Sequence, residues 1–199
     1  MAVMYPNHSR FVGNIPLSLR RFTNLSDRDM GCFVSNIEPY YSSDERLPWG
    51  YVTCRSETQG GPETNDELLW ESARMTKKLL QDGTSTASNQ TVGLLKFVSD
   101  YPKLFYGRFG KKRENTFEVS NIGLLDGGAK GSTGKAYFDW VQFSGALSAY
   151  GNPYTICVAS ARNGYMTVSS SWGTEVVADE EALELVGWLE SALVGLGDV

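Results

Sequence analysis

The sequence is poor in the side chains that most metal sites and nucleophilic centres need. Its 199 residues include one histidine, His8, so a site built from two or three histidines is excluded within one chain. The three cysteines, Cys32, Cys54 and Cys157, are far apart and form no Cys-x-x-Cys pair. This spacing excludes a zinc ribbon, and an odd, sparse set argues against a disulfide framework. We therefore predict no metal site, and we predict no cofactor.

Positive charge and long apolar runs are also scarce. The chain has 18 Lys and Arg residues against 23 Asp and Glu residues, which gives a net charge of −5. Such a chain lacks the broad positive field that non-specific nucleic-acid binding requires. No apolar run approaches the roughly 20 residues of a membrane span, and the N-terminus lacks the pattern of a secretory signal. We expect a cytoplasmic protein that binds neither nucleic acid nor membrane.

What the sequence does contain is typical of one folded domain. Hydrophobic residues make up 41% of the chain and aromatic residues 12%, which is enough for a sizeable core. We predict a single domain over residues 1–199, with a loose N-terminal segment over residues 1–13.

Three segments have the periodicity and the caps of helices. Residues 179–193 place apolar side chains on one face, with acidic residues in the first turn and Gly195 as a stop. Residues 66–81 form a second amphipathic pattern, with Gly83 just beyond its end. The pattern over residues 92–100 predicts a shorter helix that ends before Pro102.

Several β-prone runs surround these helices. Strands are predicted over residues 14–22, 117–123, 137–144, 154–162 and 165–172, and one more over 49–54 within a long connection. The last two runs are joined through Asn163-Gly164, a pair that favours a hairpin. The predicted fold class is α/β (α+β), a mixed and mostly antiparallel sheet with flanking helices.

The order of these segments is familiar. It includes Ile15-Pro-Leu-Ser-Leu-Arg20, Met30-Gly-Cys-Phe-Val-Ser35, Leu69-Trp-Glu-Ser-Ala-Arg74, Val92-Gly-Leu-Leu-Lys-Phe-Val98, Phe117-Glu-Val-Ser-Asn-Ile-Gly123 and Phe138-Asp-Trp-Val-Gln-Phe-Ser144. This series resembles the C-terminal half of the alcohol acetyltransferase group, in the chloramphenicol-acetyltransferase-like superfamily. The resemblance covers residues 14–193, and it implies half of an enzyme in which a tunnel lies between two similar halves.

One motif of that family is missing here. Its N-terminal half carries His-His-x-x-x-Asp-Gly, whose second histidine removes a proton from the acceptor. Here His8 has no adjacent histidine, and Val12 stands where the motif requires an aspartate. His8 is either a displaced general base or, as we favour, a solvated histidine in a loose segment. Without a base an alcohol is a poor nucleophile, so the chain alone is not expected to transfer acyl groups in the usual way.

Polar residues on two predicted strands are the candidate catalytic groups. Ser120 and Asn121 can hydrogen-bond a substrate carbonyl as negative charge develops on its oxygen, or they can simply satisfy backbone at a strand bend. Asp139, next to Trp140, can act as a base if it is buried.

A second group of side chains describes an apolar ligand pocket, or alternatively ordinary core. It consists of aromatic residues with interspersed amide and hydroxyl groups: Tyr137, Phe138, Trp140, Gln142, Ser144, Tyr154 and Trp172. The only dense basic run, residues 108–113, can hold phosphates of coenzyme A or of a carrier-protein arm, although a solvated loop is the more ordinary interpretation.

These observations lead to three hypotheses of different classes. The leading one is a repurposed catalyst of specialised metabolism that binds an apolar small molecule and promotes cyclisation or isomerisation, such as a Diels–Alder addition, by positioning and hydrogen bonding. The second is the C-terminal half of a coenzyme A-dependent acyltransferase whose catalytic histidine lies in a partner chain. The third is a non-catalytic binding protein, and in that case or the first the chain can form a homodimer.

Overall fold

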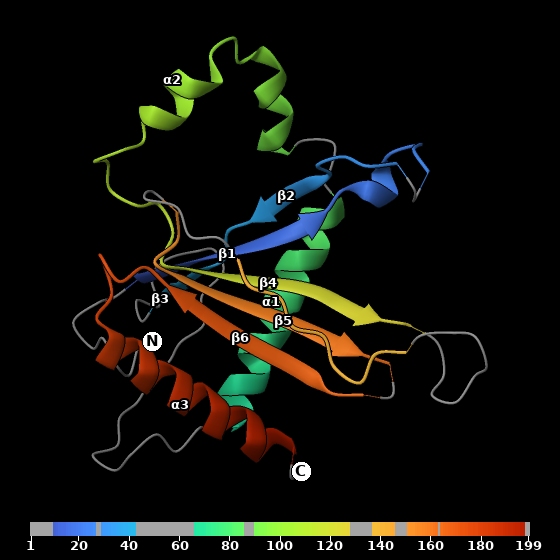
Figure 1. Ribbon diagram of the computed structural model, residues 1–199, viewed down its shortest axis with the longest axis vertical. Helices are drawn as coiled ribbons and strands as arrows, with labels where there is room; N and C mark the ends of the chain where they lie inside the picture. The colour runs from blue at the N-terminus through green and yellow to red at the C-terminus, as the bar shows by residue number, and fades with distance from the viewer. Residues whose placement is uncertain are drawn as a thin grey trace.

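The computed structural model describes residues 10–26, 29–42, 66–85, 90–127, 137–145, 151–162 and 164–197. These residues form a sheet with helices packed on it (Figure 1). The strands are β1 Arg10–Ser18, β2 Val34–Ile37, β3 Tyr40–Ser42, β4 Phe117–Leu125, β5 Tyr154–Ala161 and β6 Met166–Trp172. The helices are the 3₁₀ turns η1 Arg20–Phe22 and η3 Thr91–Phe97, and the α-helices α1 Asp66–Ser85, α2 Tyr101–Tyr106 and α3 Asp179–Gly197.

The sheet is mixed, as the sequence predicts. Its strand order is β2-β1-β4-β5-β6, and β3 also pairs with β1. The central strands β1, β4 and β5 run parallel, whereas β2, β3 and β6 are antiparallel to their neighbours. The α/β fold class with a mixed, largely antiparallel sheet is therefore confirmed.

The buried core lies on one face of the sheet. Tyr154 at the start of β5 packs with Val177, Ala182 and Leu185, and the rings of Phe117 and Trp172 cover this cluster. The indole Nε1 of Trp172 donates a hydrogen bond of 2.8 Å to Asp179 Oδ1, which ties β6 to the first residue of α3. Burial of these side chains fixes α3 against the sheet.

Helix α1 packs on the same face. The ring of Tyr41 on β3 lies 5.8 Å from that of Phe117, and its hydroxyl is 3.4 Å from Thr76 Oγ1 on α1. Near its end, α1 brings Gly83 against Ile37 of β2, where an added Cβ would lie 2.4 Å from Ile37 Cδ1. Glycine is thus the residue that lets helix and strand approach here.

The opposite face of β5 and β6 is crossed by residues 137–145, which were predicted as a strand and are not one. Their carbonyl groups accept hydrogen bonds from hydroxyls on the sheet, at Val141 from Thr167 and at Phe143 from Ser169. These carbonyl groups therefore bond to side-chain hydroxyls on the sheet face, whereas the carbonyl groups of a strand would bond to backbone N–H groups of a neighbouring strand. Hydrophobic alternation alone does not distinguish these two ways of satisfying carbonyls.

The helix boundaries differ from those predicted, because glycine and proline were given too much weight. Helix α1 continues through Gly83 to Ser85, and α3 continues through Gly195 to Gly197. The segment over residues 92–100 is the 3₁₀ turn η3, and Pro102 lies in the first turn of a new helix, α2. Proline is tolerated there because the first N–H groups of a helix have no partner within it.

Among the strands, β4, β5 and β6 confirm the predictions, and β1 is shifted toward the N-terminus. Residues 10–13, predicted as part of a loose segment, belong to β1. The short strands β2 and β3 were not predicted. The proposed strand over residues 49–54 and the turn residue Asn163 lie outside the described residues.

Candidate functional site

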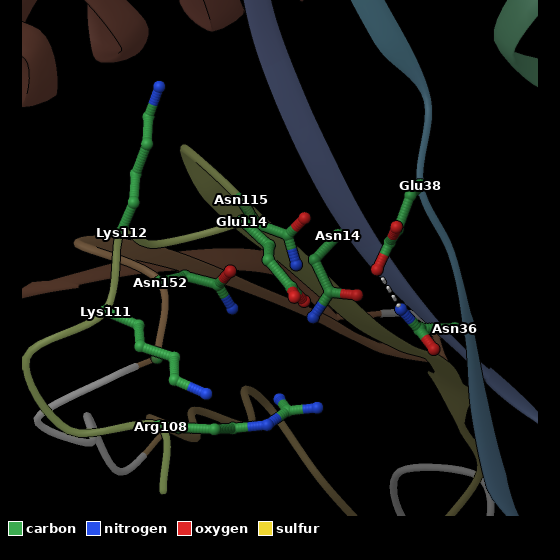
Figure 2. A pocket seen from close by; sticks show the side chains of 10 residues that line it. Asn14, Asn36, Glu38, Arg108, Lys111, Lys112, Glu114, Asn115 and Asn152 are labelled. Atoms are coloured by element: carbon green, nitrogen blue, oxygen red, sulfur yellow. Dashed lines mark hydrogen bonds between the residues drawn. The ribbon is translucent and has the colours of Figure 1, made fainter. Parts of the chain in front are cut away.

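A polar cavity of about 620 Å³ lies on the face of the sheet opposite α1 and α3. Its lining is rich in amides and in charged groups of both signs: Asn14, Asn36, Glu38, Arg108, Lys111, Lys112, Glu114, Asn115, Gly151 and Asn152 (Figure 2). We refer to this cavity as the polar pocket.

Strand alternation and one chain connection assemble this pocket. Asn14 is paired in register with Glu118, and Asn36 lies on the adjacent strand, so their side chains share the face that Phe117 and Ile37 do not occupy. The chain from α2 to β4 supplies the basic residues and Asn115, and Asn152 lies just before β5. The pocket therefore draws on segments more than a hundred residues apart.

The carboxylate of Glu118 orients two of the amides that line the pocket. Glu118 Oε2 accepts hydrogen bonds of 2.8 Å from Asn14 Nδ2 and from Asn152 Nδ2. Elsewhere in the lining, Asn36 Nδ2 donates to Glu38 Oε1 at 2.9 Å, and the Arg113 guanidinium donates to the carbonyl of Gly151, next to Asn152. These contacts fix the orientation of amides that face the cavity.

The charges are not distributed evenly. Figure 2 shows the side chains of Arg108 and Lys111 extending to the same side, toward the space below Asn14 in this view, whereas Lys112 points away. Glu38 lies across the cavity. Two cations beside several amide donors form an environment suited to an anionic group such as a phosphate.

Two buried oxygens in this region lack hydrogen-bond partners. In the described part of the chain, the buried side-chain atoms without a partner are Asn14 Oδ1 and Asn115 Oδ1. Each belongs to a residue that lines the polar pocket. Leaving a buried acceptor unpaired costs about 1–3 kcal/mol, so the fold tolerates a local penalty at this position.

The predicted pair Ser120 and Asn121 is divided between the two faces of the sheet. Ser120 is in register with Cys157, and Asn121 with Val158, so their side chains point in opposite directions. Asn121 Oδ1 accepts a 2.8 Å hydrogen bond from the backbone N–H of Gly123, at an irregularity in the β4 register. The structure thus places a local turn contact where substrate binding was predicted.

The predicted aromatic group is also divided. Tyr154 is 6% exposed within the core beneath α3, and Trp172 packs beside it. The members on the 137–145 segment lie on the other face, and they are exposed to solvent: Tyr137, Phe138, Trp140, Gln142 and Ser144. The seven side chains do not line one cavity.

The structure says little about the two remaining candidates, Asp139 and His8. Asp139 is exposed, and its backbone carbonyl accepts a hydrogen bond from Tyr165 N at 3.0 Å. His8 lies outside the described residues.

Sequence inspection identified the basic side of the polar pocket but missed its amides. Residues 108–113 were considered as a phosphate-binding run, with a solvated loop as the favoured interpretation, and Arg108 and Lys111 do line the pocket. Asn14, Asn36 and Asn152 have no common spacing that a motif could capture. The available signal was an asparagine inside an apolar strand, where its type is disfavoured.

Two features are absent from the described residues. In the described segments, no three His, Cys, Asp or Glu side chains gather closely enough to hold a metal ion. None of the described helices is long and apolar enough to cross a membrane.

Comparison with known proteins identifies relatives that are longer than this chain. No family model matches the sequence. The probable alcohol acetyltransferase FCK4 of Fusarium pseudograminearum is 26% identical over 137 residues, which cover 68% of this chain and 28% of that protein. The probable alcohol acetyltransferase crmB of Aspergillus fumigatus is 32% identical over 89 residues, which cover 45% of this chain and 19% of that protein.

Among solved structures, the epimerization domain from the third module of tyrocidine synthetase B is similar with a TM-score of 0.51. The match is 12% identical and covers 96% of this chain but 37% of that one, so it concerns the fold. The chain therefore resembles the C-terminal half of alcohol acetyltransferase-like enzymes and has a condensation-type fold, as the order of its segments predicted.

Proposed function

We propose that this chain forms one lobe of a coenzyme A-dependent acyltransferase of the alcohol acetyltransferase type, and that its polar pocket binds the phosphates of the acyl donor. The observation that carries the proposal is the presence of Arg108 and Lys111 on one side of a cavity that is otherwise lined by asparagine amides and by the carboxylates Glu38 and Glu114. The acyl donors of such reactions, coenzyme A thioesters or carrier-protein arms, carry phosphate groups.

The physical basis is charge-assisted hydrogen bonding. An arginine offers a planar pair of donors to phosphate oxygens, and a lysine adds a point charge. The asparagine amides held by Glu118 each keep a second N–H that can donate to the ligand from a fixed orientation. The resemblance to two probable alcohol acetyltransferases supports the same reaction class.

In this proposal the general base comes from a partner chain. Removal of a proton from an alcohol near neutral pH requires a positioned base, and the sequence has the single histidine His8. The partner would contribute a histidine in the His-His-x-x-x-Asp-Gly arrangement. A stoichiometric protein of similar size with that motif is expected to co-purify, and its addition should restore acetyl transfer.

Binding of coenzyme A, measured by titration calorimetry, tests the pocket directly. Arg108→Ala and Lys111→Ala, made separately, are each expected to weaken binding by about tenfold or more, because one charge-assisted contact contributes about 1.5–3 kcal/mol. Lys77→Ala is the matched control, since it removes one positive charge from an exposed position on α1, on the other face of the sheet. Equal losses in the pocket variants and the control, or no loss in any of them, would contradict the assignment.

A second candidate function is cyclisation or isomerisation of an apolar substrate. It is supported by the aromatic side chains of Tyr137, Phe138 and Trp140, which are 41%, 44% and 59% exposed on a segment that crosses the face opposite the core. Such a surface can restrain an apolar molecule, and Ser120 on the same face can hydrogen-bond a carbonyl. A non-catalytic binding protein would use the same surface without turnover.

An apolar fluorescent probe separates this candidate from the first. Phe138→Ala with Trp140→Ala should abolish probe binding and leave coenzyme A binding intact. Ser120→Ala should then lower turnover of a bound carbonyl substrate, whereas Asn121→Ala, on the other face, should not. Unchanged probe binding in the aromatic variant would rule out this surface.

A further inference from the structure

Residues 91–109 form an arm that stands away from the sheet, and the loop that follows returns to it at the polar pocket. The arm contains η3 and α2, and Figure 1 shows both helical turns above β2 and apart from α1 and α3. Among the described elements, η3 approaches β2, and α2 makes no comparable approach to the sheet or to a long helix. The arm is thus attached to the body mainly through its two ends.

The arm has an ordered internal structure. Asp100 Oδ1 accepts a 2.8 Å hydrogen bond from Lys103 N and caps α2. The Tyr101 hydroxyl donates to the Leu95 carbonyl at 2.8 Å, and the rings of Tyr101 and Phe105 are stacked with centroids 6.4 Å apart. These contacts hold the two helical turns together, so the exposure of other side chains is a property of a formed structure.

That structure presents large apolar side chains to solvent. Six of them are at least two-fifths exposed: Leu94, Phe97, Tyr101, Phe105, Tyr106 and Phe109. Phe97 at 75% and Tyr106 at 69% are the most exposed of the six. A cluster of this density on a soluble surface marks a site of contact with something apolar.

Positive charge lies beside the apolar cluster. Residues 94–113 contain six Lys and Arg residues and the single carboxylate Asp100, a local charge of +5 in a chain whose net charge is −5. Arg108, Lys111 and Lys112 line the polar pocket and Arg113 donates to the Gly151 carbonyl, so Lys96 and Lys103 are the cations that lie on the arm alone. Lys96 Nζ lies 4.9 Å from the centre of the Phe97 ring. We predicted no membrane partner because no long apolar run is present, and the net charge of the chain conceals this local excess of the opposite sign.

We propose that the arm docks on an anionic lipid surface, with its exposed aromatic side chains in the headgroup layer and its cations on lipid phosphates. Convex segments with aromatic and aliphatic tips among lysines and arginines have the composition of interfacial membrane anchors. The charge selects an anionic surface, since each cation near such a surface contributes attraction that salt screens. The arm is favoured for lipid over protein because its apolar groups lie on a projection. This inference does not depend on the acyltransferase proposal.

Sedimentation of the full chain with lipid vesicles tests the proposal. Binding is expected to vesicles of phosphatidylcholine with about 30% phosphatidylserine, and to be about tenfold weaker for phosphatidylcholine alone. Phe97→Ser with Tyr106→Ser, and separately Lys96→Glu with Lys103→Glu, should each lower binding by about tenfold. Matched controls are Leu183→Ser with Val194→Ser and Lys77→Glu with Lys78→Glu, which alter exposed residues on α3 and α1.

Insertion depth distinguishes lipid docking from simple charge attraction. Phe97→Trp adds an indole at the most exposed position of the arm, and its emission, taken as the difference from the parent protein, should shift to shorter wavelength on anionic vesicles. Absence of vesicle binding would overturn the proposal and leave an acidic protein as the partner. Binding without the emission shift, or equal losses in arm and control variants, would overturn it as well.

Discussion

Asn14 Nδ2 donates a 2.8 Å hydrogen bond to Glu118 Oε2 across two neighbouring parallel strands, between residues separated by 104 positions in the sequence. The same oxygen accepts from Asn152 Nδ2. One half-buried carboxylate therefore joins β1, β4 and the chain before β5, and it orients two of the amides in the polar pocket.

Substitution of Glu118 should show how much this contact stabilises the fold. Glu118→Gln keeps an oxygen acceptor but removes its charge, so we expect a loss of about 1 kcal/mol in the free energy of unfolding. Glu118→Leu leaves both amides without an acceptor and should cost about 2–3 kcal/mol. Urea denaturation measures both values. Glu184→Gln, on an exposed position of α3, is the control, and a leucine variant as stable as the parent would contradict the role of Glu118.

Replacing glycine with alanine is expected to have opposite effects on stability at Gly83 in α1 and at Gly187 in α3. Alanine normally stabilises a helix interior by about 0.5–1 kcal/mol relative to glycine. At Gly187 an added Cβ meets nothing within 4 Å, so Gly187→Ala should be stabilising. At Gly83 the Cβ would overlap Ile37, and overpacking of about 1–3 kcal/mol should exceed the helix gain.

Thermal and urea unfolding of the two alanine variants test this contrast. Ile37→Val removes Cδ1, the atom nearest to the added methyl group, so it should recover part of the stability lost by Gly83→Ala. A stabilised Gly83→Ala protein would mean that α1 can move away from β2 at no cost.

The helix face predicted for residues 179–193 can be tested by comparing two leucines. Leu185 is 7% exposed within the core cluster, whereas Leu183, two residues earlier, is 59% exposed. Leu185→Ala should lower the free energy of unfolding by about 2–4 kcal/mol because it leaves a cavity beneath Tyr154. Leu183→Ala should change it by less than about 0.5 kcal/mol. Similar values for the two variants would place α3 in a different rotation about its axis.

The elements that sequence analysis located correctly are those whose own pattern determines them. Strands β4, β5 and β6 are continuous β-prone runs, and α3 has an apolar stripe with acidic residues in its first turn. The short strands β2 and β3 are defined by pairing with β1, which a local pattern does not reveal. The predicted end of α1 before Gly83 was wrong because glycine is required there by the close contact with Ile37 and does not end the helix.

The candidate site was harder to predict from the sequence because its residues meet through the geometry of the sheet. Ser120 and Asn121 are adjacent in sequence, and strand alternation separates them, whereas Asn14 and Asn152 are distant in sequence and meet at Glu118. Tyr154 and Trp172 satisfied the composition of an apolar pocket and lie in the core. Only the basic run, whose members are neighbours in both sequence and space, was identified from its local pattern.

The thiol of Cys157 should make the stability of the protein depend on pH in the alkaline range. Burial raises the pKa of the Cys157 thiol, a hydrogen bond with the Gly145 backbone lowers it, and the charge of Glu118 raises it further. The folded state therefore favours the neutral thiol, whereas the unfolded chain ionises near its ordinary pKa of about 8.5. Stability from this group is fully present below that pH and falls as the pH rises above it.

Urea denaturation of the parent protein and of Cys157→Ala, at about pH 7.5 and about pH 9.5, measures this dependence. The parent should lose more stability between the two conditions than the variant, whose cavity cost does not depend on pH. Alkylation by iodoacetamide, followed for each cysteine by mass spectrometry, gives an independent comparison. Exposed Cys32 should react faster than buried Cys157 in the folded protein, and the two rates should converge in guanidinium chloride. Equal rates in the folded protein would show that the Cys157 face of β5 is open, and the predicted pH dependence would then be lost.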